Sequence, residues 1–371
     1  MASALEDLTI IDFSRILAGP LATMVLADLG ATVIKIERPG VGDDTRTWGP
    51  PFDDQGRPTY FESVNRNKTS LVLDLDDDAD RARAHGLCAT ADAVVENFRP
   101  GVMDRHGLGY EQLSADNPAL VFCSITGFGT GPGAALPGYD LLLQAVGGLM
   151  SITGEAGGPP EKVGVALVDV ITGLFATAGI LAALRHRDAT GAGQRVELDL
   201  LTSLLAALAN QASAYTVAGH VATRQGNRHP SIAPYEILDT PDGQLALAVG
   251  NDKQFAALCA VLDCPQLVTD PHYATNTARV THREALAARL RERLSARPLP
   301  EWVDKLSAAG VPAGPVNDIA AAFRLAEQLG LEPTVELERA DGSTVQLPRN
   351  PIGLSLTPAT YRSAPPPLGG A

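Results

Sequence analysis

Residues 8–37 read LTIIDFSRILAGPLATMVLADLGATVIKIE, and this stretch indicates the fold class. It starts with a β-rich run at Leu8–Phe13. After Gly19-Pro20, an apolar run predicts a helix over Leu21–Leu29, because proline is favoured just inside the start of a helix. A second β-rich run follows at Thr32–Ile36. A strand, a helix and a second strand in this order are typical of a parallel sheet.

The rest of the first third of the chain continues this alternation. Further strands are expected at Ser70–Leu75, Ala93–Glu96 and Leu120–Ile125, with a helix at Asp77–Cys88 between the first two. The fold class is therefore α/β, with an open, Rossmann-like parallel sheet. No Gly-x-Gly-x-x-Gly motif follows the first strand, so the sequence does not predict a dinucleotide site.

The second half of the chain suggests two domains. A long apolar helix is expected at Val168–Arg187, and the composition turns polar shortly after it. We predict a large domain over residues 1–220, completed by 311–371, and a smaller α/β domain over 221–310. The proline-rich tail, 354–371, is expected to run over the surface.

Composition excludes several classes of protein. A net charge of −14 argues against a nucleic-acid partner. The N-terminus lacks a basic, apolar leader, and we expect no apolar run to approach the roughly 20 residues of a membrane span, so a cytoplasmic protein without a membrane partner is predicted. The four cysteines and seven histidines lack metal-ligand spacing, so no metal site is expected.

Two aspartates stand out in apolar surroundings. Asp140 precedes the apolar run Leu141–Met150, where a carboxylate that caps a helix is a strong explanation. Asp169 has apolar neighbours on both sides, and an isolated carboxylate in such a place is costly unless it is paired or caps a helix. From spacing alone, helix cap and catalytic group are equally plausible for Asp169.

Several short motifs along the chain carry a family resemblance when they are taken together in this order and spacing. They are Ala18-Gly19-Pro20, Leu29–Arg38, Asn65–Lys68, Val95–Gly101 and Thr126–Gly129. With these motifs the chain resembles, nearly end to end, the class III CoA-transferase family, which includes formyl-CoA transferase, carnitine CoA-transferase and the α-methylacyl-CoA racemases.

The resemblance implies an acyl-CoA:carboxylate CoA-transferase with Asp169 as its nucleophile. Asp169 would attack the donor thioester to form a mixed anhydride, and CoA would then form an aspartyl-CoA thioester that the acceptor acid resolves. No permanently bound cofactor is implied, since coenzyme A and acyl-CoA are substrates. Residue-by-residue matching gives as CoA contacts Ala18, Arg38, Leu73, Asn97, Phe98 and Arg105. Core packing is a competing explanation for Phe98.

Tyr139 separates two enzyme classes within the resemblance. The racemases have Gly-His-Asp where this chain has Gly138-Tyr139-Asp140, and that histidine serves as an acid/base group in proton exchange. Tyrosine, with a pKa of about 10, is a poor base near neutral pH. We therefore expect a transferase, with the racemase as the alternative, and take Asp169, Asp140 and Tyr139 as the candidate catalytic residues. A non-enzymatic acyl-CoA-binding subunit is a further alternative, which the presence of Asp169 disfavours.

The substrates are less well defined by sequence. Formyl-CoA transferases carry a run of glycines where Arg224–Ser231 has only one, which argues against the formyl/oxalate pair and leaves succinyl-CoA with a dicarboxylate as the preferred pair. Arg224, Arg228 and His229 are either part of a solvated loop or contacts for a substrate carboxylate. The resemblance also implies an interlocked homodimer, in which two ring-shaped chains thread each other.

Overall fold

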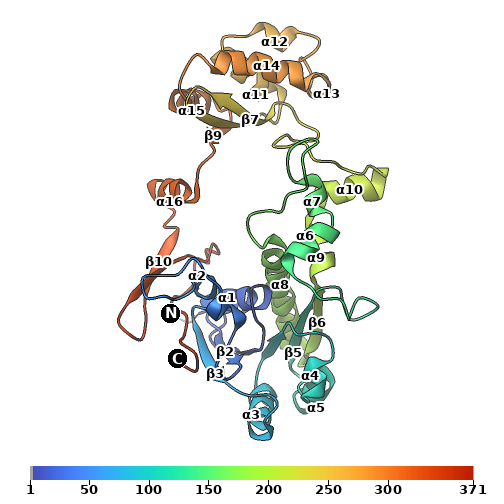
Figure 1. Ribbon diagram of the computed structural model, residues 1–371, viewed down its shortest axis with the longest axis vertical. Coiled ribbons are helices and arrows are strands. Elements are labelled where there is room, and N and C mark those ends of the chain that lie inside the picture. The colour runs from blue at the N-terminus through green and yellow to red at the C-terminus, as the bar shows by residue number, and fades with distance from the viewer. Residues whose placement is uncertain (1–2, 371) are drawn as a thin grey trace. The chain divides into compact units, whose positions relative to one another are not determined.

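A computed structural model describes residues 3–370 of the chain, so Met1, Ala2 and Ala371 lie outside the described residues. Within that range it shows an α/β protein with a six-stranded parallel sheet and two smaller antiparallel sheets (Figure 1). The α/β prediction with a parallel sheet is confirmed. The six parallel strands are β1 (Thr9–Asp12), β2 (Thr32–Glu37), β3 (Lys68–Val72), β4 (Ala93–Glu96), β5 (Val121–Thr126) and β6 (Gln194–Asp199).

The strand order of the large sheet is β3-β2-β1-β4-β5-β6. The chain runs outward from β1 to β3 on one side and from β4 to β6 on the other, so the direction of winding reverses between β1 and β4. Open α/β sheets bind ligands at such a reversal, outside the carboxyl ends of the strands. The turns that follow β1 and β4 are therefore where a site is expected.

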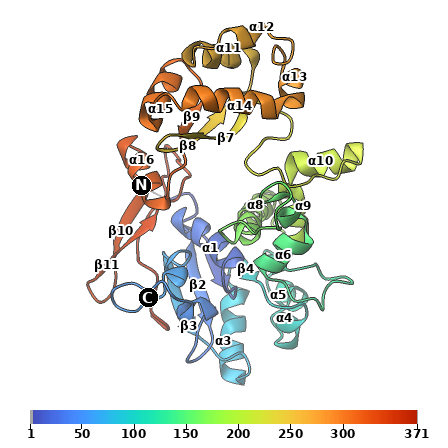
Figure 2. The same ribbon diagram turned by 45° about the horizontal axis from the view of Figure 1, so that its top comes forward.

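Helices cover both faces of this sheet, as Figures 1 and 2 show. One buried cluster joins alternate residues of the strands to α1 (Ala18–Asp28) and α8 (Leu167–Thr190). The other joins the opposite strand faces to α3 (Asp78–Ala89), α4 (Val102–Arg105) and α5 (Tyr110–Asp116). Successive strand residues point to opposite faces, and with both faces covered the central strands β1, β4 and β5 are mainly apolar, as buried parallel strands usually are.

Helix α8 corrects one prediction. By length and composition alone it would suffice to cross a membrane, whereas no run of that kind was expected from the sequence. Core helices of folded domains share this composition, and α8 buries Ala176, Ile180 and Ala183 against α1 and the sheet. A Cβ on Gly173 would lie 2.6 Å from the carbonyl oxygen of Ala18. The missing side chain therefore lets α8 approach the start of α1 closely.

Two long apolar runs of the sequence each form two helices rather than one. The run Leu141–Met150 forms α6 (Asp140–Val146) and α7 (Leu149–Ile152), separated at Gly147-Gly148, where Gly148 has a φ of 88°. The run Leu200–Thr216 forms α9 (Leu200–Ala207) and α10 (Ala209–Ala218), with Ala209 at a φ of 46° between them. A residue in the left-handed region ends the regular helix in both places.

Contacts divide the chain into two compact units. The larger comprises residues 1–150, 162–221 and 332–371, and the smaller comprises 151–161 and 222–331. This division places 151–161 and 311–331 in the smaller unit, where the sequence placed them with the large domain. The smaller unit contains the antiparallel strands β7 (Tyr235–Thr240), β8 (Gly243–Ala248) and β9 (Ala313–Pro315), and its helices are α11 (Asp252–Val261), α12 (Gln266–Thr269), α13 (Asn276–Thr281), α14 (Arg283–Leu294), α15 (Leu299–Ala308) and α16 (Ile319–Gln328).

The C-terminal segment is more closely packed than its proline content predicted. It follows the hairpin of β10 (Thr334–Glu338) and β11 (Thr344–Pro348) and buries Ala364 and the two prolines after it. The backbone N–H of Ser70 donates to the carbonyl of Gly370 (2.8 Å), and that of Asn67 to the carbonyl of Ser363 (3.1 Å). The tail therefore borders the β3 side of the sheet and is part of the larger unit.

Candidate active site

The turns after β1 and β4 are joined by one side chain. Asn97, directly after β4, accepts a hydrogen bond from the backbone N–H of Arg15 (2.8 Å) and donates one to the Arg15 carbonyl (2.7 Å). An amide can make both bonds at once because it carries a donor and an acceptor. The two turns therefore form one continuous wall at the reversal point of the sheet.

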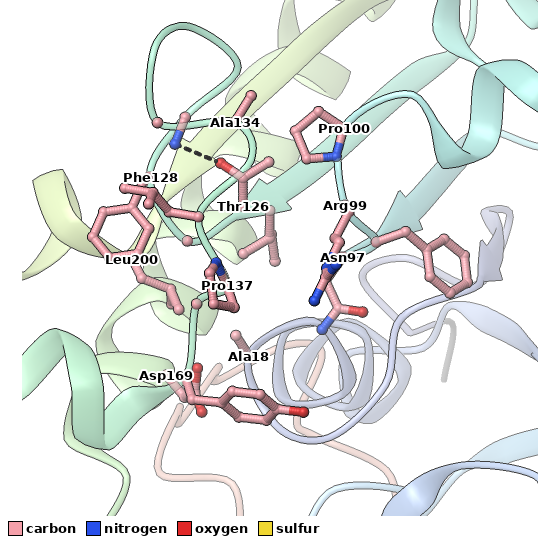
Figure 3. Close-up of a pocket in the computed structure, with 18 of the residues that line it drawn as sticks. Ala18, Asn97, Arg99, Pro100, Thr126, Phe128, Ala134, Pro137, Asp169 and Leu200 are labelled. Carbon is pink, nitrogen blue, oxygen red and sulfur yellow. Dashed lines mark hydrogen bonds between the residues drawn. The ribbon is translucent and has the colours of Figure 1, made fainter.

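A cavity of about 210 Å³ opens beside this wall and contains Asp169. Figure 3 shows Asp169 next to Ala18 at one end, with Asn97 and Arg99 on one side and Phe128 and Leu200 on the other. The remaining lining comes largely from the loop between β5 and α6 and includes Thr126, Gly127, Gly129, Gly133, Ala134, Leu136, Pro137, Gly138 and Tyr139. Three predicted contact residues, Ala18, Asn97 and Phe98, thus lie in the same cavity as Asp169.

Asp140 is occupied by hydrogen bonds rather than exposed to this cavity. Its Oδ1 accepts from the backbone N–H of Val168 (2.8 Å) and, more weakly, from that of Asp169 (3.4 Å). The side-chain Nε2 of Gln144 donates to its Oδ2 (2.6 Å), and the side-chain Oε1 of Gln144 accepts from the N–H of Val163 (2.9 Å). Asp140 therefore caps the helix that carries Asp169, which is a different helix from its own.

Asp169 has the opposite surroundings. It lies in the first turn of α8 and is partly buried, and no described residue donates a hydrogen bond to its side chain. Burial, with the charge of Asp140 as a second cause, raises the pKa of Asp169 to about 7. A carboxylate that is poorly solvated and unpaired is basic and available for reaction, as expected of a functional group in a cleft.

Two tyrosines lie near Asp169. Tyr139, predicted from sequence, lines the cavity but is 60% exposed. Tyr60 was not identified from the sequence. Burial, and then the charges of Asp169 and Asp140, raise the pKa of Tyr60 to about 12, so its hydroxyl is protonated at neutral pH. Its ring packs edge-on against Trp48, with 5.3 Å between the ring centroids. Nothing in the sequence links α2 (Thr59–Glu62) to α8, so only the fold could reveal this residue.

A second cavity, of about 340 Å³, adjoins the same wall from outside. It is lined by the predicted contacts Arg38, Leu73 and Phe98, and also by Arg15 and His106. The Arg15 guanidinium lies over the Phe98 ring, 4.8 Å from its centroid. Phe98 lines both cavities and so separates them.

Arg105 does not join this group. It is the last residue of α4, is exposed, and lines neither of these two cavities. Arg15 lies directly after β1 but was not selected from the sequence, because a single arginine in a turn is usually a solvated charge. Its position after the first strand of a Rossmann-like sheet was the signal that could have identified it.

The arginines of the loop after α10 are engaged within the smaller unit. Arg224 donates to the carbonyls of Gly158 (3.1 Å) and Ser151 (3.3 Å). Arg228 pairs with Glu284 and, at 3.5 Å, with Glu236. These contacts favour a structural role over a free carboxylate receptor. Within residues 3–370, no group of three or more His, Cys, Asp or Glu side chains could hold a metal ion.

Comparison with known proteins gives the same assignment along the whole chain. Residues 5–371 match the model of CoA-transferase family III. The succinate–glutarate CoA-transferase of Agrobacterium fabrum is 44% identical, over 98% of this chain and 93% of its own length. The acetyl-CoA:oxalate CoA-transferase of Acetobacter aceti is 42% identical, over 94% and 89%. The crystal structure of a CAIB/BAIF family protein from Brucella suis superimposes with a TM-score of 0.88 at 42% identity, covering 100% of this chain and 97% of that one.

These matches span both units and include the motifs that line the Asp169 cavity. The family uses acyl-CoA substrates, and the predicted enzyme class, an acyl-CoA:carboxylate CoA-transferase, is confirmed. The chain belongs to CoA-transferase family III.

Proposed function

We propose that the enzyme moves CoA from succinyl-CoA to a second dicarboxylate, with Asp169 as the nucleophile. The observation that supports Asp169 as the nucleophile is that its carboxylate is unpaired and partly buried, has a raised pKa and lies in a cavity. Succinate, glutarate and oxalate in the names of the two relatives support dicarboxylates as the substrate class.

The proposed reaction needs no net proton transfer. An Asp169 oxygen attacks the thioester carbon of the donor, the C–S bond breaks, and CoA leaves as a thiolate. The thiolate attacks the Asp169 carbonyl carbon of the mixed anhydride and expels the donor acid as a carboxylate. The acceptor carboxylate then attacks the aspartyl thioester and releases the thiolate again. Attack of that thiolate on the acceptor acyl carbon forms the product and frees Asp169.

The two predicted partners of Asp169 receive different roles. Asp140 is a positioning residue, because its carboxylate holds the first turn of α8 and its charge helps raise the pKa of Asp169. Tyr139 lies at the exposed edge of the cavity, where it would contact substrate or help to exclude water. Exclusion of water matters because both the anhydride and the thioester hydrolyse.

The two cavities suit the two ends of CoA. The thioester must reach Asp169, so the acyl end belongs in the first cavity. The second cavity offers two guanidinium groups, Arg15 and Arg38, for phosphate oxygens. Asn97 and Phe98, between the cavities, would contact the pantetheine chain. Arg105 remains a candidate only if its exposed side chain turns towards the nucleotide.

We also propose an interlocked homodimer. Helices α10 and α16 bury none of their residues within the chain, although they expose large apolar side chains: Tyr215, Val217, Ile319 and Leu325. Isolated helices of this length are marginal in water, and apolar side chains exposed on helices without packing partners in the chain are typical of an association site. A second copy is the occupant that the family resemblance implies.

The dimer predicts a mass in solution of twice the 38.8 kDa of one chain. Light scattering coupled to size exclusion checks this. A mass of one chain at micromolar concentration would contradict the proposal.

Substrate class is tested by a CoA-exchange screen. Purified enzyme is incubated with succinyl-CoA and a panel of free acids, and new thioesters are identified by mass spectrometry. We expect glutaryl-CoA or another dicarboxylyl-CoA to form faster than any monocarboxylyl-CoA. Preference for monocarboxylates would refute the proposed substrates while leaving the family assignment intact.

Replacing the nucleophile should separate chemistry from binding. Asp169→Asn is expected to lower kcat by about 10⁴-fold or more, the scale seen when a covalent nucleophile is removed, and to leave CoA affinity nearly unchanged. Steady-state transfer and calorimetric CoA titration check this. Asp199→Asn is the matched control, because Asp199 caps α9 through the Thr202 N–H and lines neither cavity. Turnover retained in Asp169→Asn would remove Asp169 from the mechanism.

The pH dependence follows from the raised pKa of Asp169. Only the ionised carboxylate attacks, so kcat/KM should fall about tenfold for each pH unit below about 7. Dicarboxylate substrates are already ionised there, as ordinary carboxyl groups titrate near pH 4. Asp140→Asn removes a like charge and should shift the midpoint to lower pH. A profile that stays flat from about pH 5.5 to about pH 8 contradicts the prediction.

A further inference from the structure

Glu96 is a buried carboxyl group that the proposed reaction does not use. It is the last residue of β4, directly before Asn97, and is 6% exposed. It does not line the cavity that contains Asp169. Glu96 nevertheless lies directly before the turn that forms the wall between the two proposed CoA cavities.

Both carboxylate oxygens of Glu96 are used inside the protein. Oε2 accepts from the backbone N–H of Phe98 (2.8 Å), and Oε1 accepts from the hydroxyl of Ser124. Glu96 and Ser124 are direct register partners on the parallel strands β4 and β5. The carboxylate therefore ties the turn after β4 to the neighbouring strand.

No cation neutralises this carboxyl group in the described contacts. Glu96 itself lines a cavity of about 170 Å³, together with Arg99, Asp104, Tyr110 and Arg195. The charge of Arg195 acts to lower the pKa of Glu96, but the Arg195 guanidinium pairs with Glu197 (3.1 Å). Burial raises the pKa of Glu96 to about 7, although its hydrogen bonds oppose this. A buried carboxyl group kept at this cost without an ion pair calls for a specific role.

The turn that Glu96 holds is also tied to the turn after β1. Asn97 fastens the turn to the backbone of Arg15, and Phe98 presents its ring to both cavities and to the Arg15 guanidinium. If the Phe98 N–H lost its acceptor, the ring and the neighbouring amide would lose the anchor that fixes their direction.

We propose that Glu96 is a positioning residue that fixes the acyl-CoA-binding turn Asn97–Arg99 through its bonds to the Phe98 N–H and the Ser124 hydroxyl. This inference rests on the proposed placement of CoA against Asn97 and Phe98. Since Glu96 does not line the Asp169 cavity, it acts on binding and not on the chemical steps.

The decisive experiment compares three variants in the full-length enzyme. Glu96→Ala should raise KM for succinyl-CoA about tenfold, the effect of one lost charge-assisted hydrogen bond, with kcat within about twofold. Glu96→Gln keeps an acceptor for Phe98 and a donor for the Ser124 oxygen, so it should restore KM and leave the midpoint of the kcat/KM profile in place. Ser124→Ala should raise KM less than Glu96→Ala. Calorimetric CoA affinity should follow KM in every variant.

Controls separate positioning from simple stability. Glu62→Ala removes another buried carboxylate of the same unit, which bonds Arg339 and lines neither CoA cavity; it should lower thermal stability without changing KM. Glu96→Ala with reduced stability and an unchanged KM would overturn the inference, as would a large loss of kcat in Glu96→Gln. Should Glu96→Ala fail to fold, an unchanged KM in Ser124→Ala overturns it.

Asn97→Ala and Phe98→Ala test the underlying placement of CoA. If neither substitution changes KM for succinyl-CoA, the proposed CoA site itself is wrong.

Discussion

Two buried lysines, Lys35 within β2 and Lys68 at the start of β3, link these strands to the end of β1 and to the turns beside it, and the active-site wall depends on them. Lys68 donates to Asp12 (3.1 Å), and Lys35 pairs with Asp43 (2.9 Å) and donates to the Ser14 carbonyl (2.7 Å); all four charged side chains are fully buried. Burial lowers the pKa of Lys68 to about 8, while burial alone would raise that of Asp12 and the lysines bring it below its ordinary value. Loss of one member would leave an unpaired buried charge, at a cost of about 3–5 kcal/mol.

This network shapes the turn after β1. Ile16 has a φ of 72°, a conformation that costs a β-branched residue about 1–3 kcal/mol. The Asp43 carboxylate, held by Lys35, accepts from the Ile16 N–H (3.2 Å), and Asn97 holds Arg15 on the other side. The turn is thus fixed from two directions, and it directs the chain into α1 so that Ala18 meets Gly173 of α8 beside Asp169. Strain in the turn is offset by ion pairs outside the cavity.

The sequence predicted those elements of the fold and the site that depend on local patterns of residues. The β1–α1–β2 unit, β4 and α8 follow from apolar runs and their breaks, and Asp169 followed from its apolar neighbours together with the family motifs. Interactions between distant segments could not be predicted in this way. Asp140 was expected to cap the helix that it begins, but it caps α8, and Tyr60 and Arg15 gain their positions only from packing. Strand β7 was not predicted, because it follows the part of the chain where the composition turns polar.

Asp140 and Asp169 show how one fold gives two neighbouring carboxylates opposite properties. Asp140 receives backbone N–H groups and the Gln144 amide, so its charge is satisfied and fixed. The backbone N–H of Asp169 also bonds weakly to Asp140, but no described residue donates to the Asp169 side chain, which lies next to the Asp140 charge. A fully bonded Asp169 would be a weaker nucleophile, and an unsatisfied Asp140 would free the first turn of α8. The reactivity of Asp169 therefore depends on donors that the fold directs to Asp140 instead, and this asymmetry is invisible in two aspartates considered one at a time.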